Sequence, residues 1–179
     1  SPSRVRLSAH IGAGKVFIHT GSGGDILTAV ASYSRASRAP RLVTSMAGSV
    51  LNVDYSTGRG STFLPLIYDR PDEHTLTLGR PEIPTEFELG VGGGRVDAVL
   101  TGLSATGFSV KIGGGTVKMG FPEAPTARPA ASGDWGARTL RFDIGAGTAE
   151  IVEIGNTGVQ RVTGNIGSGT AYLDFSGTR

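Results

Sequence analysis

The sequence contains no cysteine, so disulfide bonds, thiolate metal ligands and thiol nucleophiles are excluded throughout its 179 residues. Lysine is scarce, and the 17 basic residues nearly balance the 15 acidic ones. No Lys/Arg cluster with interleaved aromatic residues occurs, and we therefore expect no nucleic-acid partner. No apolar run approaches the roughly 20 residues that span a bilayer, so we expect any signal segment or membrane anchor to lie outside these residues.

Glycine is the abundant residue. It accounts for 29 of the 179 residues, about double its share of roughly 7% in an average protein. Much of it stands in one phrase that occurs five times: an apolar residue, Gly, any residue, Gly, and then a small or apolar residue two positions later. The five copies occupy residues 11–16, 91–96, 112–117, 144–149 and 166–171. A recurring phrase of this kind indicates a repeat architecture.

The segments around the phrases alternate between apolar and polar residues, as in Phe87-Glu88-Leu89 and Leu140-Arg141-Phe142. This period of two predicts strands with one buried and one solvated face. No segment shows a convincing helical period, and residues 27–38 are the only weak helical candidate. The sequence therefore predicts an all-β protein.

The spacing within the phrase carries geometric information. The flanking apolar residues, for example Ile112 and Val117, are always five positions apart. Five is odd, so in a straight strand the two side chains would point to opposite faces. Because both are apolar, we expect both to face the core, which requires a turn or bulge at Gly-x-Gly.

Two architectures satisfy this requirement. In a single-stranded β-solenoid each phrase is the corner of one coil, and in a β-meander or sandwich each phrase is the loop of a hairpin. The intervals of 21 residues from Val91 to Ile112 and 22 from Ile144 to Ile166 favour the solenoid. We predict one domain over 1–179, with an irregular first half (1–83), regular repeats (84–179) and loop insertions at 67–83 and 121–134.

The glycine phrases lack the form of a phosphate-binding loop, because they lead into strands and no Gly-Lys-Ser/Thr follows. The histidines are His10, His19 and His74, whereas a zinc site needs three or four ligands held together. His10 and His19 flank one phrase at outward positions without an acidic neighbour in it. We predict a solvated face there, and we assign no metal-binding or cofactor-binding residue.

Glycoside cleavage requires two carboxylates within roughly 5–10 Å of each other. The candidates are Asp69, Asp72 and Glu73 in a charged loop, and Glu86 with Glu88 on one strand face. Glu86 and Glu88 occupy the polar positions of an alternating strand, and the charged loop cluster is typical of a solvated turn. We therefore assign no catalytic residue and expect a non-enzymatic protein.

Carbohydrate recognition would also call for aligned aromatic side chains. The candidates Tyr33, Tyr55, Tyr68 and Trp135 are scattered along the sequence and predict no binding platform. Trp135 follows a Pro/Ala/Gly-rich loop, and we expect it to cap one end of the core. A carbohydrate-binding or carbohydrate-active β-helix is the alternative function, and a self-assembling β-solenoid filament is a second alternative.

The strand–Gly-x-Gly–strand segments 87–103, 108–119 and 142–151 resemble the "putative adhesin" and toast-rack domains of bacterial envelope proteins. The resemblance is clearest over 84–179 and absent at 67–83. It implies a glycine-rich β-solenoid ectodomain in the bacterial cell envelope, acting as an extracytoplasmic scaffold, adhesion-like or stress-sensing module. It implies no catalytic residues, and it implies a protein partner in the envelope or self-association, with a glycan as a further candidate partner.

The ends of a stack of coils are sites where chains could associate. An uncapped terminal coil would expose unpaired backbone groups, which are a template for pairing with another chain. We predict that the strand containing Leu173 and Phe175 lies at one end of the stack.

Overall fold

The structure is a computed structural model of the chain, and it describes residues 2–57, 71–125 and 138–177. These residues form one eleven-stranded sheet and two short 3-10 helices, with no α-helix among them. The prediction of an all-β protein is confirmed. The weak helical candidate at 27–38 is instead a strand followed by the first 3-10 helix.

The elements follow one another along the chain as strands, interrupted by the two 3-10 helices. They are β1 (Arg4–Ile11), β2 (Gly14–Thr20), β3 (Leu27–Ser32), η1 (Ala36–Arg38), β4 (Pro40–Ala47), β5 (Val50–Thr57), β6 (Glu73–Leu78), β7 (Thr85–Val91), β8 (Gly94–Val99), β9 (Ala105–Gly120), β10 (Thr139–Val152), η2 (Ile154–Thr157) and β11 (Arg161–Leu173).

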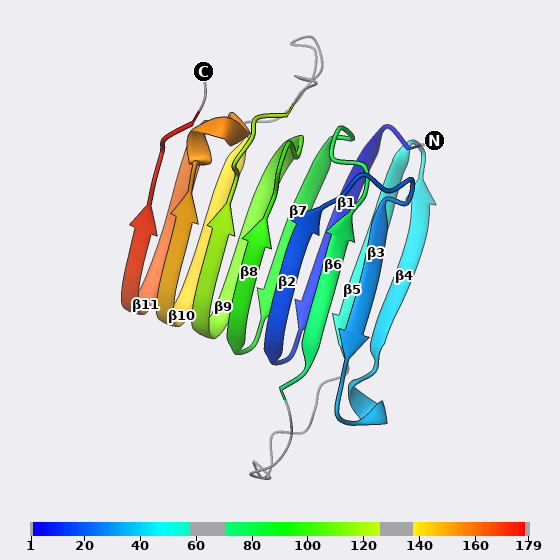
Figure 1. Cartoon of the computed structure of the whole chain (residues 1–179), viewed down its shortest axis with the longest axis horizontal. Helices are drawn as coiled ribbons and strands as arrows, with labels where there is room; N and C mark the ends of the chain where they lie inside the picture. The colour runs from blue at the N-terminus through cyan, green and yellow to red at the C-terminus, as the bar shows by residue number, and fades with distance from the viewer. Residues whose placement is uncertain (1, 58–70, 126–137, 178–179) are drawn as a thin grey trace.

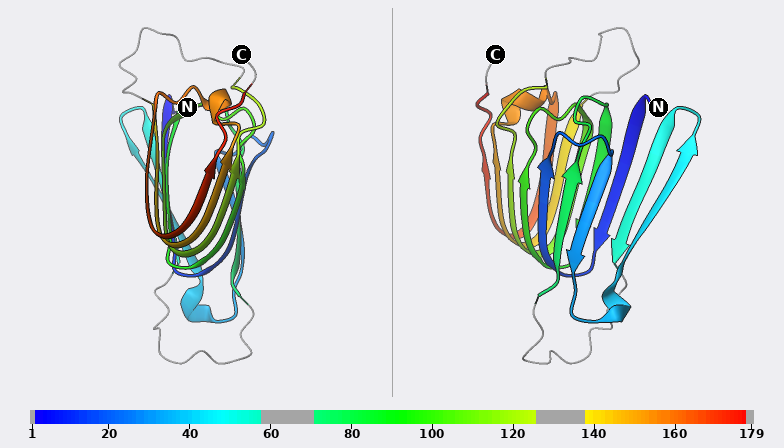
Figure 2. Two further views of the ribbon diagram at one scale, coloured as in Figure 1. Left: turned by 90° about the vertical axis from the view of Figure 1, so that its left-hand side faces the viewer. Right: turned by 45° about the vertical axis from the view of Figure 1, so that its right-hand side comes forward.

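The sheet folds back on itself along the glycine phrases, so that its two halves face each other (Figure 1; Figure 2). One half, here layer A, contains β3, β6, β2, β8 and the second halves of β9, β10 and β11. The other half, layer B, contains β4, β5, β1, β7 and the first halves of the three long strands. A repeat unit is therefore one layer B strand, a glycine phrase and one layer A strand.

Successive repeat units pair in parallel and in register, with phrase over phrase. Gly94 pairs with Gly14 on one side and with Gly115 on the other, and Gly147 lies between Gly115 and Gly169. Among the described residues, eight of the ten strand pairings are parallel, and β3–β6 and β4–β5 are antiparallel. Within the described ranges, the hairpin arrangement thus occurs once around a glycine, at the β4–β5 turn beside Gly48.

The second glycine of each phrase is required by its backbone conformation. Gly115 and Gly147 have φ of +130° and +138°, a region that side-chain-bearing L-residues rarely adopt. A Cβ on Gly115 would also overlap the carbonyl oxygen of Gly94 in the unit beside it, and one on Gly147 would overlap that of Gly115. The corner therefore depends on glycine twice, for its turn and for the close approach of neighbouring backbones.

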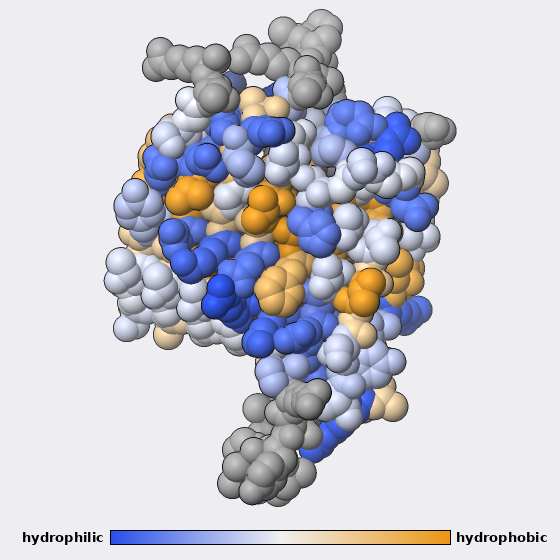
Figure 3. All heavy atoms as spheres, viewed as in Figure 1, coloured by the Kyte–Doolittle hydropathy of each residue, from blue (hydrophilic) through white to orange (hydrophobic). Residues whose placement is uncertain are grey.

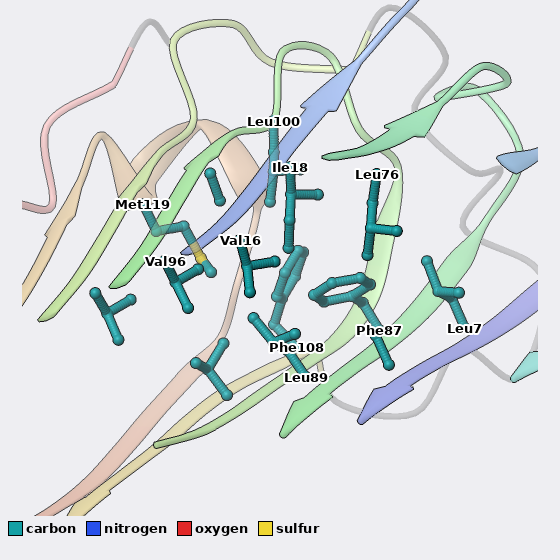
Figure 4. Packing of buried hydrophobic residues seen from close by; sticks show 14 of the residues in the cluster. Leu7, Val16, Ile18, Leu76, Phe87, Leu89, Val96, Leu100, Phe108 and Met119 are labelled. Atoms are coloured by element: carbon teal, nitrogen blue, oxygen red, sulfur yellow. The ribbon is translucent and has the colours of Figure 1, made fainter. Parts of the chain in front are cut away.

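The core lies between the two layers, where the flanking apolar residues of the phrases meet, as expected from their odd spacing. Ile112 and Val117 are 3% and 1% exposed, although they stand five positions apart. Figure 4 shows Phe87 and Phe108 from layer B among the aliphatic side chains of layer A, with their ring centroids 5.1 Å apart. Burial of aliphatic and aromatic side chains at this density is the main favourable term for such a fold.

The segments that lead from a layer A strand back to the next layer B strand, here called the return segments, close the side of the core opposite the glycine corners. They contribute five buried apolar side chains: Ile83, Leu100, Leu103, Phe121 and Ile154. Phe121 packs edge-on against Phe108 at 5.5 Å, so the start of the predicted surface loop 121–134 belongs to the core. That part of the loop prediction is wrong, because Phe121 continues the inward alternation of Val117 and Met119.

The order of the repeat units differs from their order in the sequence. The unit of β1 and β2 lies between the β5–β6 unit and the β7–β8 unit. β3 and β4 then run along the outer edges of β6 and β5, one in each layer. The segment 73–78, predicted as part of an insertion, is an ordinary strand of the sheet, since β6 pairs with β2 through six residues.

The far end of the sheet agrees with the expectation from sequence. β11 pairs only with β10 among the described strands, so it is the terminal strand of both layers. The strand ends at Leu173, and Phe175 follows it as an exposed residue.

The glycine corner can be tested by a substitution at Gly115, with a matched control at the adjacent residue Gly114. Gly115→Ala should lower the free energy of unfolding by about 3 kcal/mol, because it combines a strained φ with overlap against Gly94. Gly114→Ala should change it by less than ~0.5 kcal/mol, since the corresponding position holds alanine at Ala13 and Ala146. Urea unfolding of both variants measures the difference, and equal effects would contradict the account of the corner.

Candidate functional site

The exposed histidines lie on different layers. His10, at the end of β1, has its Nε2 2.9 Å from the Ser8 hydroxyl, and His19, in β2, has its Nε2 2.9 Å from the Thr77 hydroxyl. Both side chains are outward, as predicted. Each is hydrogen-bonded to a hydroxyl group and not to another histidine or to a carboxylate. Within the described ranges no group of three or more His, Asp or Glu side chains could hold a metal ion.

Glu86 and Glu88 lie on the outer surface of layer B, where each is paired with a basic residue. The guanidinium of Arg6 donates to Glu86 at 3.0 Å, and the ammonium of Lys111 donates to Glu88 at 3.2 Å. Arg4 lies 3.7 Å from Glu86. The two carboxylates belong to separate ion pairs on a solvated surface, which agrees with their interpretation as the polar half of a strand.

Asp72 and Glu73 point to different environments. Glu73 is exposed and pairs with Lys15 at 3.1 Å, whereas Asp72 is only 7% exposed. The Asp72 carboxylate accepts a hydrogen bond from the Ser34 amide at 3.2 Å and lies 3.5 Å from the Arg38 guanidinium. The prediction of a solvated turn is therefore wrong for Asp72, which ties the β3–η1 connection to the start of β6.

His74 lies within the predicted loop insertion 67–83, but its ring is fully buried. Its Nδ1 lies 2.8 Å from the hydroxyl of Tyr55, which is also buried, and the two rings meet edge to face at 5.9 Å. His74 comes from layer A and Tyr55 from layer B, so the pair bridges the core at its β5–β6 unit. The His74 Nε2 has no hydrogen-bond partner among the described residues.

Burial controls the titration of this pair. Desolvation lowers the pKa of the His74 imidazole, and the negative charge of Asp72 opposes that shift. Burial raises the pKa of the Tyr55 hydroxyl to about 12. At neutral pH the pair is therefore an uncharged polar contact inside the core.

The two outer surfaces of the molecule differ in composition. We call the outer side of β1, β7 and the first halves of β9, β10 and β11 the charged face. Its charged residues are Arg4, Arg6, Glu86, Glu88, Lys111, Arg141, Asp143 and Arg161. No large exposed hydrophobic residue of the described chain lies on these strands, whereas Val43 of the edge strand β4, outward on the same layer, is 43% exposed.

The outer side of layer A, which we call the mixed face, carries apolar side chains between ion pairs. Four large apolar residues are exposed there: Phe17 (36%), Val30 (64%), Val99 (53%) and Tyr172 (60%). Figure 3 shows apolar residues among charged ones across this face. Its charges are paired, for example Lys118 with Glu150 at 2.7 Å.

The strand registers place these side chains on adjacent rows. Val30, Phe17 and Tyr172 lie on one row that crosses the whole layer, together with Thr75, Asp97, Lys118 and Glu150. Val99 lies on the next row beside His19. In the part of the chain that the structure describes, this surface therefore combines exposed aromatic and aliphatic side chains with ion-paired charges.

Sequence reasoning missed both the buried pair and the mixed face, although a signal for each is present. His74 stands two positions before Leu76 and four before Leu78, which is the inward period of β6. Val16-Phe17-Ile18 interrupts the alternation, since an apolar residue occupies an outward position. Asp69, Tyr68 and Trp135 lie outside the described residues, and Tyr33 is exposed at the end of β3.

Searches of protein families and of curated proteins found no match to the sequence. Among solved structures, the chain is similar to a "putative cell adhesion protein" from Clostridium sporogenes, with a TM-score of 0.76. The two are 18% identical, and the likeness covers 99% of this chain and 94% of that chain. At this identity the likeness shows a shared fold over essentially the whole chain. No helix in the described parts is long and apolar enough to cross a membrane.

The Tyr55–His74 pair predicts a dependence of stability on pH. The unfolded chain protonates His74 near pH 6.5, but the folded chain does so only at lower pH, because its pKa is lowered. The unfolded state therefore gains protons first, and the free energy of unfolding should fall as the pH drops below about 6.5.

Urea unfolding at about pH 7.5 and pH 5 measures this loss. In the double variant Tyr55→Phe/His74→Leu, which replaces both polar partners by apolar groups, the part of the loss due to His74 should disappear. His19→Gln, which removes an exposed histidine, should leave it unchanged. Equal pH dependence in the native chain and the double variant would contradict the assignment.

Proposed function

We propose that the chain is a non-enzymatic, extracytoplasmic scaffold module of the bacterial cell envelope, in which a glycine-cornered β-solenoid presents the mixed face to a protein partner. The observation that carries the proposal is the difference between its two outer faces. In the described ranges, one bears charged residues and no large exposed hydrophobic residue, and the other bears exposed Phe17, Val99 and Tyr172. Such a difference has no role in folding, since both faces lie outside the core.

The parallel, in-register pairing of the repeat units supports the solenoid description, because each unit contacts only its neighbours along the stack. The likeness to a "putative cell adhesion protein" supports an adhesion-like role for the same fold. The resemblance of the glycine phrases to envelope domains supports a location outside the cytoplasm.

Binding would follow from the composition of the mixed face. Phe17 and Tyr172 offer large side chains with little rotamer freedom to lose, which favours them at the centre of interfaces. The ion pairs Lys118–Glu150, between Phe17 and Tyr172, and Lys15–Glu73, beside Phe17, already neutralise each other's charge. Contact with a partner would then bury apolar surface without leaving a charge unpaired.

A non-enzymatic role agrees with the arrangement of the titratable groups. The candidate acids Glu86 and Glu88 are held in separate ion pairs, and Asp72 is occupied by Ser34 and Arg38. Among the described residues, these carboxylates do not converge on a common position where a substrate could be protonated and attacked.

Adhesion of coated beads tests the proposal. Beads that carry the chain should be retained under flow on a layer of intact bacterial cells, compared with beads that carry albumin. The variant Phe17→Ser/Val99→Ser should reduce retention about tenfold, because it removes two apolar contacts from the mixed face. Both side chains point outward, so the core is unchanged.

The matched control is Glu88→Ser/Lys111→Ser, which removes an ion pair from the charged face and should leave retention unchanged. Retention no greater than that of albumin beads, or an equal loss in the control, would contradict the proposal. Release of reducing sugars from a panel of cell-wall polysaccharides would instead favour a carbohydrate-active protein.

A further inference from the structure

The terminal strand β11 has a free edge along both layers of the sheet. Its backbone pairs with β10 on one side, and no described strand lies on the other. Among its thirteen residues, RVTGNIGSGTAYL, only Arg161 is charged and none is proline. Edge strands in soluble proteins are ordinarily protected by charges, prolines or a covering segment, and β11 has a single charge at its first residue and no proline.

The core is also open at this end. The inward side chains of β11 are only partly buried, namely Val162, Ile166, Ala171 and Leu173. Gly164 occupies the remaining inward position, and the ring of Phe142 fills the space beside it, where a Cβ would overlap the ring. The end therefore presents an apolar surface in which the ring of Phe142 stands in place of a side chain at position 164.

The shape of β11 makes this edge self-complementary. Figure 2, left, looks onto this end and shows the strand descending one layer and ascending the other as a U. A rotation by 180° about the midline of the U exchanges its arms and reverses their direction. We propose that β11 pairs with β11 of a second copy about this two-fold axis, forming antiparallel ladders in both layers.

The odd spacing of the glycine phrase determines the register. Inward residues must face inward residues, and Ile166 and Ala171 flank the corner at five positions. Ile166 of one copy then lies opposite Ala171 of the other, and Gly164 lies opposite Leu173. The leucine of each copy then lies over the glycine of the partner, where no side chain separates it from the ring of Phe142.

The outward pairs in this register are also compatible. Thr163 lies opposite Asp174, Asn165 opposite Tyr172, and Arg161 opposite Ser176, so no two like charges face each other. An isologous contact of this kind uses one patch twice and closes at two copies.

The opposite end of the sheet offers no equivalent surface for head-to-tail stacking. There the layers end in β4 and β3, joined through η1, which lies beyond the line of the corners (Figure 1). The inward residues Leu42 and Met46 of β4 are 47% and 56% exposed, while their partners Tyr55 and Leu51 in β5 are more deeply buried. The long U of β11 therefore fits a copy of itself better than it fits the β3–β4 end.

The dimer has a consequence that rests on the proposed function. The two-fold axis places layer A of one copy beside layer B of the other. The two mixed faces then point to opposite sides of a continuous double-length sheet, so one dimer could bridge two surfaces. Oligomeric state and bead retention are measured separately, so failure of the dimer leaves the test of surface binding intact.

Analytical ultracentrifugation of the full chain, with charge changes at Thr163, tests the pairing. Thr163→Glu places a carboxylate opposite Asp174 at each of the two symmetry-related contacts and should weaken dimerisation about tenfold, whereas Thr163→Lys should preserve or strengthen it. Thr148→Glu, one strand inside the edge and equally exposed, is the control and should have no effect.

A single cysteine tests the axis directly, since the chain has none of its own. Ser168 lies at the corner beside the proposed axis. The Cα atoms of the two Ser168 residues in the dimer would therefore lie within the separation that a disulfide spans. Ser168→Cys should cross-link with itself under mild oxidation. Mixed with Ala36→Cys, a variant at the η1 end, it should form no hetero-dimer.

Three results would overturn the proposal. They are a monomer at all concentrations, equal effects of Thr163→Glu and Thr163→Lys, and cross-linking of Ser168→Cys only with Ala36→Cys. The last result would indicate head-to-tail growth instead of a closed pair.

Discussion

The close approach of backbone to backbone at the glycine corners is the constraint on which the structure depends. At each corner the carbonyl of one repeat unit occupies the space where a Cβ of the next would stand, as with Gly94 beneath Gly115. This contact aligns the units in register. The positive φ of the second glycine then turns the chain so that the apolar residues on both sides of the phrase enter one core.

The faces and ends of the molecule follow from that alignment. In-register stacking places equivalent outward residues in rows, so ion pairs form between neighbouring strands, as with Glu88 and Lys111. The same rows gather Phe17, Val30 and Tyr172 on the outer side of layer A. At the β5–β6 unit the Tyr55–His74 pair fills the core where Ala9 and Val16 stand in the next unit.

Much of the repeat could be predicted from the sequence, because local spacing governs it. The parity of Ile112 and Val117 predicted the turn, and alternation predicted the polar side of Glu86 and Glu88. The placement of β1 and β2 between later units could not be predicted, since period-two alternation is the same for every neighbour. Burial of His74 was missed because a charged sequence before it is typical of a loop, and the mixed face depends on strand registers that only the fold supplies.

Replacement of Gly115 by D-alanine, through ligation of a synthetic segment, tests the central claim most directly. D-alanine accepts a positive φ, and its Cβ projects away from the position that the Gly94 carbonyl fills. The account predicts that the D-alanine protein unfolds at nearly the native urea concentration, whereas the L-alanine protein unfolds at a much lower one. Equal destabilisation by the two enantiomers, or none by either, would contradict the claim that the glycine corners organise the fold.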